Sequence, residues 1–162
     1  MNGNPDRKNR KHLRRLRPFV NQCHSIYYVT MCAKDRRAIL TEPDLCKSIT
    51  ESLHQTVDKH GWAVGAYVIM PDHLHFLCFN VKNLKSISGF LRDFKRWTSR
   101  AARNLGYEIP LWQKEFFDRL LRKNDLYYEK MEYMRMNPVR AKLCESPEQW
   151  ESFGICHPLI EG

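Results

Sequence analysis

Two strand-forming runs that follow each other almost directly place the strongest constraint on the fold. Residues 62–70 and 73–80 are each rich in apolar, β-branched and aromatic residues, and only Pro71-Asp72 separates them. Because proline cannot donate a hydrogen bond within a sheet, it ends the first run and lets the chain turn. We therefore predict that the two runs form an antiparallel hairpin.

Patterns on both sides of this hairpin predict the remaining elements. They are a strand at 25–33, a helix at 41–61, a helix at 84–105, a short strand at 115–121 and a last helix from Asn124 to Asn137, where Pro138 is expected to end it. The order β-α-β-β-α-β with a C-terminal helix predicts an α+β fold. It is the ferredoxin-like split βαβ arrangement, an antiparallel sheet with helices on one face.

The helix at 84–105 has two distinct faces. Its apolar side is expected to hold Leu84, Ile87, Phe90, Leu91, Phe94, Trp97, Ala101 and Leu105. The opposite side carries bases with no acid among them: Lys85, Arg92, Arg96 and Arg103. A charged face is usually only solvated, but an all-basic one also suits contact with phosphate groups.

The net charge of +9 is concentrated at the N-terminus, whereas the rest of the chain is nearly balanced. Seven bases lie within residues 1–17: Arg7, Lys8, Arg10, Lys11, Arg14, Arg15 and Arg17. We interpret residues 1–18 as a basic arm and residues 19–162 as a single domain. A dense cationic arm is typical of a nucleic-acid partner, and a solubilising tail is the alternative.

The composition excludes several classes of protein. Apolar residues make up 43% of the chain, which is enough for a folded core, but no run reaches the length of a membrane span. The six cysteines form no CxxC and no zinc-finger spacing, so reduced thiols are expected. We expect a cytoplasmic protein that does not bind membranes.

A pair of histidines begins the strand at 73–80. His73 and His75 are two positions apart, so on a strand they face the same way, with Cα atoms about 6.6 Å apart. Two imidazoles at this separation can bind one divalent ion, while Leu74, Phe76 and Cys78 turn towards the core. The motif alone is weak, because two histidines on a solvated strand face also satisfy the pattern.

The last helix carries a second candidate group. Tyr133 and Asn137 are four positions apart and so lie on one helical face. A phenol is a poor nucleophile near neutral pH, so it needs an activated target or a nearby cation, and a metal that polarises a phosphate meets that need. The amide of Asn137 offers an oxygen ligand for a hard ion. Tyr128 with Glu132 is a rival pair on another face of the same helix.

Four segments together resemble a known family. Residues 67–77, YVIMPDHLHFL, are similar to the signature of the HUH single-tyrosine transposases. Residues 133–141, YMRMNPVRA, and 112–122, WQKEFFDRLLR, resemble segments of one branch, the REP-associated tyrosine transposases, as does Trp150-Glu-Ser152. The resemblance extends over roughly residues 20–155 in the family's order.

The resemblance implies an activity and a set of roles. Tyr133 would attack the scissile phosphate of single-stranded DNA near a palindromic hairpin and form a 5′-phosphotyrosine link. His73 and His75 would hold Mg²⁺ or Mn²⁺, with Asn137 as third ligand. Insertion-sequence relatives carry Gln at that position, so Asn137 is one methylene shorter. Those relatives tend to act as dimers, whereas the REP-associated branch implies a monomer.

Two other classes remain as alternatives. One is a catalytically silent, structure-specific nucleic-acid-binding module on the same fold. The third strand lacks the aromatic RNA-stacking pattern of an RRM, which argues against the usual form of such a module. The other is a small-molecule metallohydrolase, which the cationic arm and the basic helix face disfavour.

Overall fold

A five-stranded antiparallel sheet is the centre of the molecule. The computed structural model describes residues 25–122 and 124–158, so the basic arm predicted at 1–18 lies outside the described residues. The strands are β1 (Tyr27–Cys32), β2 (Trp62–Ile69), β3 (His73–Asn80), β4 (Phe117–Leu120) and β5 (Phe153–Ile155). Their order in the sheet is β4-β1-β3-β2-β5, so the first four strands have the predicted ferredoxin-like arrangement.

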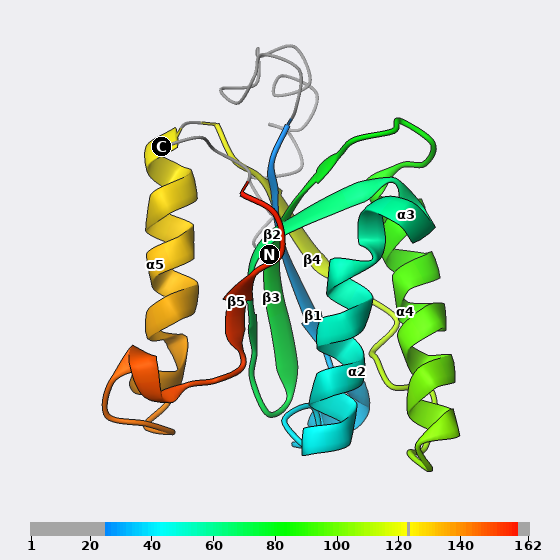
Figure 1. Ribbon diagram of the computed structural model, residues 1–162, viewed down its shortest axis with the longest axis vertical. Helices are drawn as coiled ribbons and strands as arrows, with labels where there is room; N and C mark the ends of the chain where they lie inside the picture. The colour runs from blue at the N-terminus through cyan, green and yellow to red at the C-terminus, as the bar shows by residue number, and fades with distance from the viewer. Residues whose placement is uncertain (1–24, 123, 159–162) are drawn as a thin grey trace, which may run out of the picture.

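The helices lie on both faces of this sheet. The helical segments are η1 (Lys34–Arg36), α2 (Pro43–His54), α3 (Thr56–His60), α4 (Ile87–Asn104), α5 (Asn124–Arg140) and η2 (Pro147–Gln149). Figure 1 shows α2, α3 and α4 on one side of the sheet and α5 on the other. The fold prediction is confirmed, and the C-terminal helix covers the face that the other helices leave open.

Each face of the sheet has its own apolar core. Towards α2 and α4 the core includes Phe76 of β3 and Phe90 and Phe94 of α4, all fully buried. Towards α5 a smaller core joins Leu77 of β3 to Met134 of α5. Alternate residues of β3 thus enter opposite cores, because successive side chains of a strand point to opposite faces.

The predicted hairpin of β2 and β3 is confirmed, but it contains a bulge. Its register shifts between Val64 and Tyr67. Before the shift Trp62 and Val64 enter the core below α2 and α4, whereas after it Tyr67 and Ile69 do. The extra residue reverses the alternation along β2, which a simple period of two in the sequence does not predict.

The helices at 41–61 and 84–105 differ in detail from the predictions. The first is two helices that meet at Gln55, and Gly61 ends the second in the left-handed conformation at φ 74°. The helix predicted at 84–105 begins only at Ile87, because Ser86 is its N-cap and the Ser86 hydroxyl accepts a hydrogen bond from the Gly89 N–H. Leu84 therefore lies before the helix and is 71% exposed.

The apolar face predicted for this helix was partly wrong. Trp97 and Leu105 are exposed, whereas Thr98 is buried. The Trp97 ring lies against the ammonium of Lys59, 4.7 Å from the ring centroid, so it packs with a cation at the surface. The Thr98 hydroxyl donates to the Phe94 carbonyl and accepts from the indole N–H of Trp112, which satisfies it in the core.

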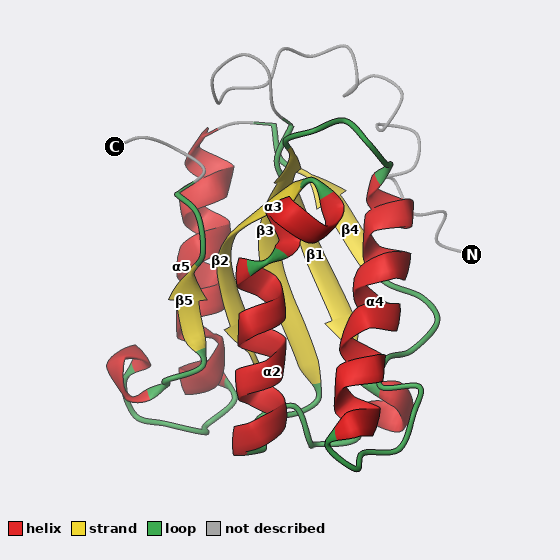
Figure 2. Ribbon diagram, turned by 45° about the vertical axis from the view of Figure 1, so that its right-hand side comes forward, coloured by secondary structure: helices red, strands yellow, loops and turns green. Residues whose placement is uncertain are grey.

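The predicted end of α5 was wrong, and the last strand was missed. α5 passes through Pro138 and ends two residues later at Arg140, so the lost N–H bond and the crowding of the ring against the preceding turn fall at the very end of the helix. The chain then returns by η2, and β5 pairs with β2 at the edge of the sheet (Figure 2). The indole N–H of Trp150 donates to the Ile69 carbonyl and ties this return to β2.

Candidate active site

His73 is oriented by a carboxylate that directly precedes it. Its Nδ1 lies 2.7 Å from Oδ1 of Asp72, and Nε of Arg36 lies 3.0 Å from the other carboxylate oxygen. Burial by itself would raise the pKa of Asp72, but the hydrogen bond from His73 and the charge of Arg36 lower it overall. An ionised Asp72 accepts the Nδ1–H of His73, so Nε2 is the nitrogen left for a further ligand.

His75 is buried, so it does not lie on the solvated strand face that the alternative interpretation of the histidine pair requires. It is 8% exposed, because α5 covers this face of the sheet. Thr30 stands opposite it on β1, and His75 Nδ1 lies 2.8 Å from the Thr30 hydroxyl and 3.0 Å from that of Tyr28. Both hydroxyls can accept an Nδ1–H, which again leaves Nε2 available.

Burial keeps His75 neutral at physiological pH. Desolvation lowers its pKa to about 3, and the charges of His73, Lys130 and Arg36 act in the same direction. Burial also raises the pKa of Tyr28, whose ring stacks on the imidazole with 5.4 Å between centroids. A neutral imidazole is the form that binds metal, so His75 needs no proton release to do so.

The two imidazoles and the Tyr133 ring lie close together. The ring centroids of His73 and His75 are 4.7 Å apart, and those of His75 and Tyr133 are 6.4 Å apart. Tyr133 is 45% exposed, so a substrate in solvent can reach it. The structure thus brings the predicted strand pair and the predicted tyrosine to one place, because α5 packs against β2 and β3.

Two cations lie against the same tyrosine. The guanidinium carbon of Arg140 is 4.1 Å from the Tyr133 ring centroid, and Nζ of Lys130 is 5.5 Å from it. Arg140 also donates to the Tyr133 carbonyl oxygen. Positive charge beside a phenol attracts a phosphodiester and stabilises negative charge that develops on the attacked phosphate.

The donor set fits a divalent metal ion. Two imidazoles whose Nδ1 atoms are held by a carboxylate or a hydroxyl are the arrangement in which Nε2 binds metal. Among residues 25–122 and 124–158, no third His, Cys, Asp or Glu joins them in a cluster that could bind a metal ion. The remaining positions would fall to an amide such as Asn137, which is half-buried one turn after Tyr133, and to water or phosphate oxygens.

The rival tyrosine lies in a different setting. Tyr128 is 45% exposed and its ring packs edge-on against Tyr127, at 5.4 Å between centroids. Its partner Glu132 is held by Arg135 at 3.0 Å. The geometry therefore favours Tyr133 over Tyr128 as the tyrosine beside the histidines.

The four bases of the predicted helix stripe do not act alike. Arg92, Arg96 and Arg103 line one pocket beside α4. Lys85 lies before the helix, and its ammonium is 2.9 Å from Oδ2 of Asp93. Asp93 also lies 3.5 Å from Nε of Arg92, so the stripe includes an acid that neutralises part of its charge.

The chain matches the model of one protein family over residues 21–122, described as transposase IS200-like. The matched residues make up more than half of the chain and include His73 and His75. The chain belongs to the IS200-like transposase family. The predicted family is thereby confirmed, and this transposase is an enzyme of a class that acts on DNA.

Individual relatives agree with this membership. The transposase is 25% identical over 136 residues to a Haemophilus influenzae protein assigned as a REP-associated tyrosine transposase, covering 77% of this chain and 76% of that one. A solved REP-associated tyrosine transposase bound to a REP hairpin superposes with a TM-score of 0.65 at 18% identity, over 85% of each chain. A solved Deinococcus radiodurans protein assigned as a transposase gives 0.53 at 18% identity, over 67% of this chain and 86% of that one.

Several residues of the site were missed in the sequence. Tyr28 and Thr30 reach His75 only through the pairing of β1 with β3. Lys130 and Arg140 lie on α5 with Tyr133, three residues before it and seven after it, so helical spacing could have placed them on its face. Asp72 could have been found from the sequence, because a carboxylate directly before a ligand-type histidine is a common orienting group.

No helix among the described residues is long and apolar enough to span a membrane.

Proposed function

We propose that this transposase is a metal-dependent endonuclease and strand transferase for single-stranded DNA, with Tyr133 as its nucleophile. The observation that carries the proposal is the edge-on contact of the Tyr133 ring with His75, at 6.4 Å between centroids. It puts an exposed phenol next to a pair of imidazoles that are oriented by Asp72, Thr30 and Tyr28. This is a suitable neighbourhood for attack on a phosphate.

The proposed reaction has two steps on the same tyrosine. In the first, the Tyr133 phenol gives its proton to solvent and Oη bonds to the scissile phosphorus. The bond from this phosphorus to the 5′ oxygen is kept, and its bond to the 3′ oxygen breaks. The 3′ oxygen leaves with a proton as a 3′-OH. In the second, a 3′-OH attacks the phosphotyrosine, which restores the phenol and joins the strands.

His73, His75 and Asn137 are the proposed ligands of Mg²⁺ or Mn²⁺. The bound ion would polarise the phosphate and stabilise the charge of the transition state. Other groups of the chain orient the two imidazoles: Asp72 fixes the ring of His73, and Thr30 and Tyr28 fix the ring of His75. Arg140 and Lys130 flank the nucleophile and bind the strand electrostatically.

The proposed substrate is a DNA strand with a palindromic hairpin. Support comes from the solved structural neighbour, a REP-associated tyrosine transposase bound to a REP hairpin. The basic arm of residues 1–17 and Arg92, Arg96 and Arg103 would bind phosphates without reading sequence. We propose a monomer that acts in the cytoplasm, where its DNA substrate lies.

The decisive experiment detects the covalent intermediate. The full chain is incubated with Mn²⁺ and labelled single-stranded hairpin oligonucleotides from its own genome, then denatured and separated by gel electrophoresis. A labelled band at the mass of protein plus DNA is expected. Tyr133→Phe should remove this band and lower cleavage by roughly a thousandfold or more, with DNA affinity nearly unchanged.

The matched control is Tyr128→Phe, which removes the other exposed phenol of α5 and should leave the adduct intact. If the adduct disappeared only in Tyr128→Phe, the nucleophile would be Tyr128. Tight hairpin binding without an adduct under any metal would instead favour the catalytically silent binding module.

A further inference from the structure

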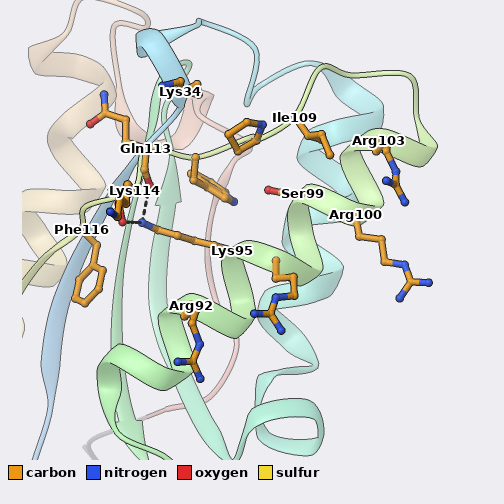
Figure 3. A pocket seen from close by; sticks show the side chains of 13 residues that line it. Lys34, Arg92, Lys95, Ser99, Arg100, Arg103, Ile109, Gln113, Lys114 and Phe116 are labelled. Carbon is orange, nitrogen blue, oxygen red and sulfur yellow. Dashed lines mark hydrogen bonds between the residues drawn. The ribbon is translucent and has the colours of Figure 1, made fainter.

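A basic pocket lies on the opposite side of the sheet from Tyr133. It has a volume of about 790 Å³ and is lined by α4, by η1 and by residues 109–116 (Figure 3). Seven of its lining residues are Lys or Arg, and none is Asp or Glu. Ile109, Pro110, Trp112 and Phe116 supply an apolar surface between these bases.

Two cations, Lys95 of the pocket lining and Arg37 next to η1, hold the backbone of residues 108–115 in place. Nζ of Lys95 donates to the carbonyl oxygens of Gln113, Lys114 and Glu115, at 2.7, 2.9 and 2.8 Å. Arg37 likewise donates to the carbonyls of Glu108 and Pro110. The segment opposite α4 is thus held at a set distance from the helix, and the pocket is preformed.

Other cations of the pocket are left without acidic partners. Arg96, Arg100 and Arg103 are exposed, and within the described part of the chain none of them has a carboxylate within ion-pair distance. Figure 3 shows the side chains of Arg100 and Arg103 extending from α4 beside the pocket. Guanidinium groups on one helix that have no carboxylate partner are a binding surface for phosphates.

A three-residue segment connects the pocket to the proposed cleavage centre. Lys34 of η1 lines the pocket, and its backbone N–H donates to the Leu111 carbonyl. Arg36, two residues later, forms the 3.0 Å ion pair with Asp72, which orients His73. η1 therefore joins the lining of the pocket to the ion pair that orients His73.

We propose that this pocket is a second DNA-binding site, which holds an unpaired nucleotide and its flanking phosphates while the same strand passes η1 to reach Tyr133. The proposal rests on DNA being the substrate, as argued above. The arginines bind the phosphates, and the apolar surface between them takes the face of the base.

The apolar lining selects single-stranded over duplex DNA. In a duplex the bases are stacked and paired inside, so only phosphates and sugars would meet Ile109, Pro110 and Phe116. An unpaired base can leave the stack and cover that surface, as in other single-strand sites that combine cations with aromatic residues. The pocket volume of about 790 Å³ admits a base and its sugar.

The test measures binding in the absence of cleavage. The full chain in EDTA is titrated with a fluorescent oligothymidine strand at several salt concentrations. Arg100→Ala/Arg103→Ala should weaken binding by roughly tenfold and reduce the slope of log K against log[salt] by about 1.4, since each lost phosphate contact on a single strand counts about 0.7. A duplex of equal length should lose less.

The matched control removes two cations elsewhere. Lys47→Ala/Lys82→Ala takes the same charge from α2 and from the loop after β3, and neither residue lines the pocket. It should change the dissociation constant by less than about twofold. Equal losses in the two double variants would mean that only bulk charge matters and would overturn the pocket.

A second measurement uses the unaltered protein. Oligothymidine with scattered 5-iododeoxyuridine is photocrosslinked, and the modified peptide is identified by mass spectrometry. Crosslinks within residues 109–116 support the site, whereas crosslinks confined to other segments overturn it. Both readouts are independent of the phosphotyrosine adduct, so the pocket and the proposed nucleophile can fail separately.

Discussion

The Tyr133 ring stands edge-on to the imidazole of His75, with 6.4 Å between the ring centroids and an interplanar angle of 73°. The two residues come from α5 and β3, and Met134, next to Tyr133, is fully buried in the core that α5 shares with the sheet. The packing of α5 therefore sets the separation between the proposed nucleophile and the proposed metal ligands. The same packing covers His75 and keeps it neutral.

The proposed ligands can be tested by metal affinity. His73→Ala and His75→Ala should each weaken Mn²⁺ binding by roughly a hundredfold or more and remove cleavage, because two of the few protein donors are involved. Asn137→Ala should cost less, since water can occupy an open octahedral position. Isothermal titration calorimetry with Mn²⁺ measures all three.

His54→Ala is the matched control for these variants. His54 lies exposed on α2, where its ring contacts Tyr67 and not the histidine pair. Its removal should leave Mn²⁺ affinity unchanged. Wild-type affinity in both His73→Ala and His75→Ala would show that the metal binds elsewhere.

Asp72 is expected to act as a positioning residue through His73. Asp72→Asn keeps the size of the side chain but loses the charge that accepts the Nδ1–H, so Mn²⁺ affinity should fall by roughly tenfold to a hundredfold. The DNA affinity measured in EDTA should not change. Arg36→Ala should lower the Mn²⁺ affinity less, because Arg36 contacts Oδ2 of Asp72 and not Oδ1, which lies beside His73.

A merely structural role for Asp72 would give a different result. In that case Asp72→Asn would lower the melting temperature and the affinities for metal and for DNA together. A loss of Mn²⁺ affinity at an unchanged melting temperature is the outcome that identifies the positioning role.

His60 should make stability depend on pH. It is buried beside Phe90 and Phe94, and its Nδ1 has no hydrogen-bond partner among residues 25–122 and 124–158. Burial lowers its pKa, and the charges of Lys85 and Lys59 add to this, while Asp93 opposes it. The folded state thus resists protonation at a pH where the unfolded state, with a pKa of about 6.5, takes up a proton.

The free energy of unfolding should therefore fall as the pH is lowered through about 6.5. His60→Leu removes this contribution, so its melting temperature should drop less than that of the wild type between about pH 7.5 and about pH 5. His54→Leu, at an exposed position, should follow the wild type. Parallel curves for His60→Leu and the wild type would contradict a depressed pKa at His60.

The sequence by itself determined most of the elements and singled out His73, His75 and Tyr133 as candidate site residues. Short-range patterns decide these: the runs at 62–70 and 73–80 form the hairpin, and Gly61 ends a helix as expected. The alternation of β3 correctly put Leu74, Phe76 and Cys78 in one core and the histidines on the other face. Where the local signal was ambiguous, as at Pro138, the prediction was wrong.

Only the tertiary structure decided how these residues meet. α5 covers one face of the sheet because Met134 of α5 and Leu77 of β3, which are remote in sequence, are buried in the same core. That contact covers His75 and brings Tyr133 beside it, while the pairing of β1 with β3 adds Tyr28 and Thr30 as partners of His75. The joining of Lys95 to the carbonyls of residues 113–115 forms the basic pocket in the same way. Such contacts arise from packing between distant segments, and no periodicity within a single segment encodes them.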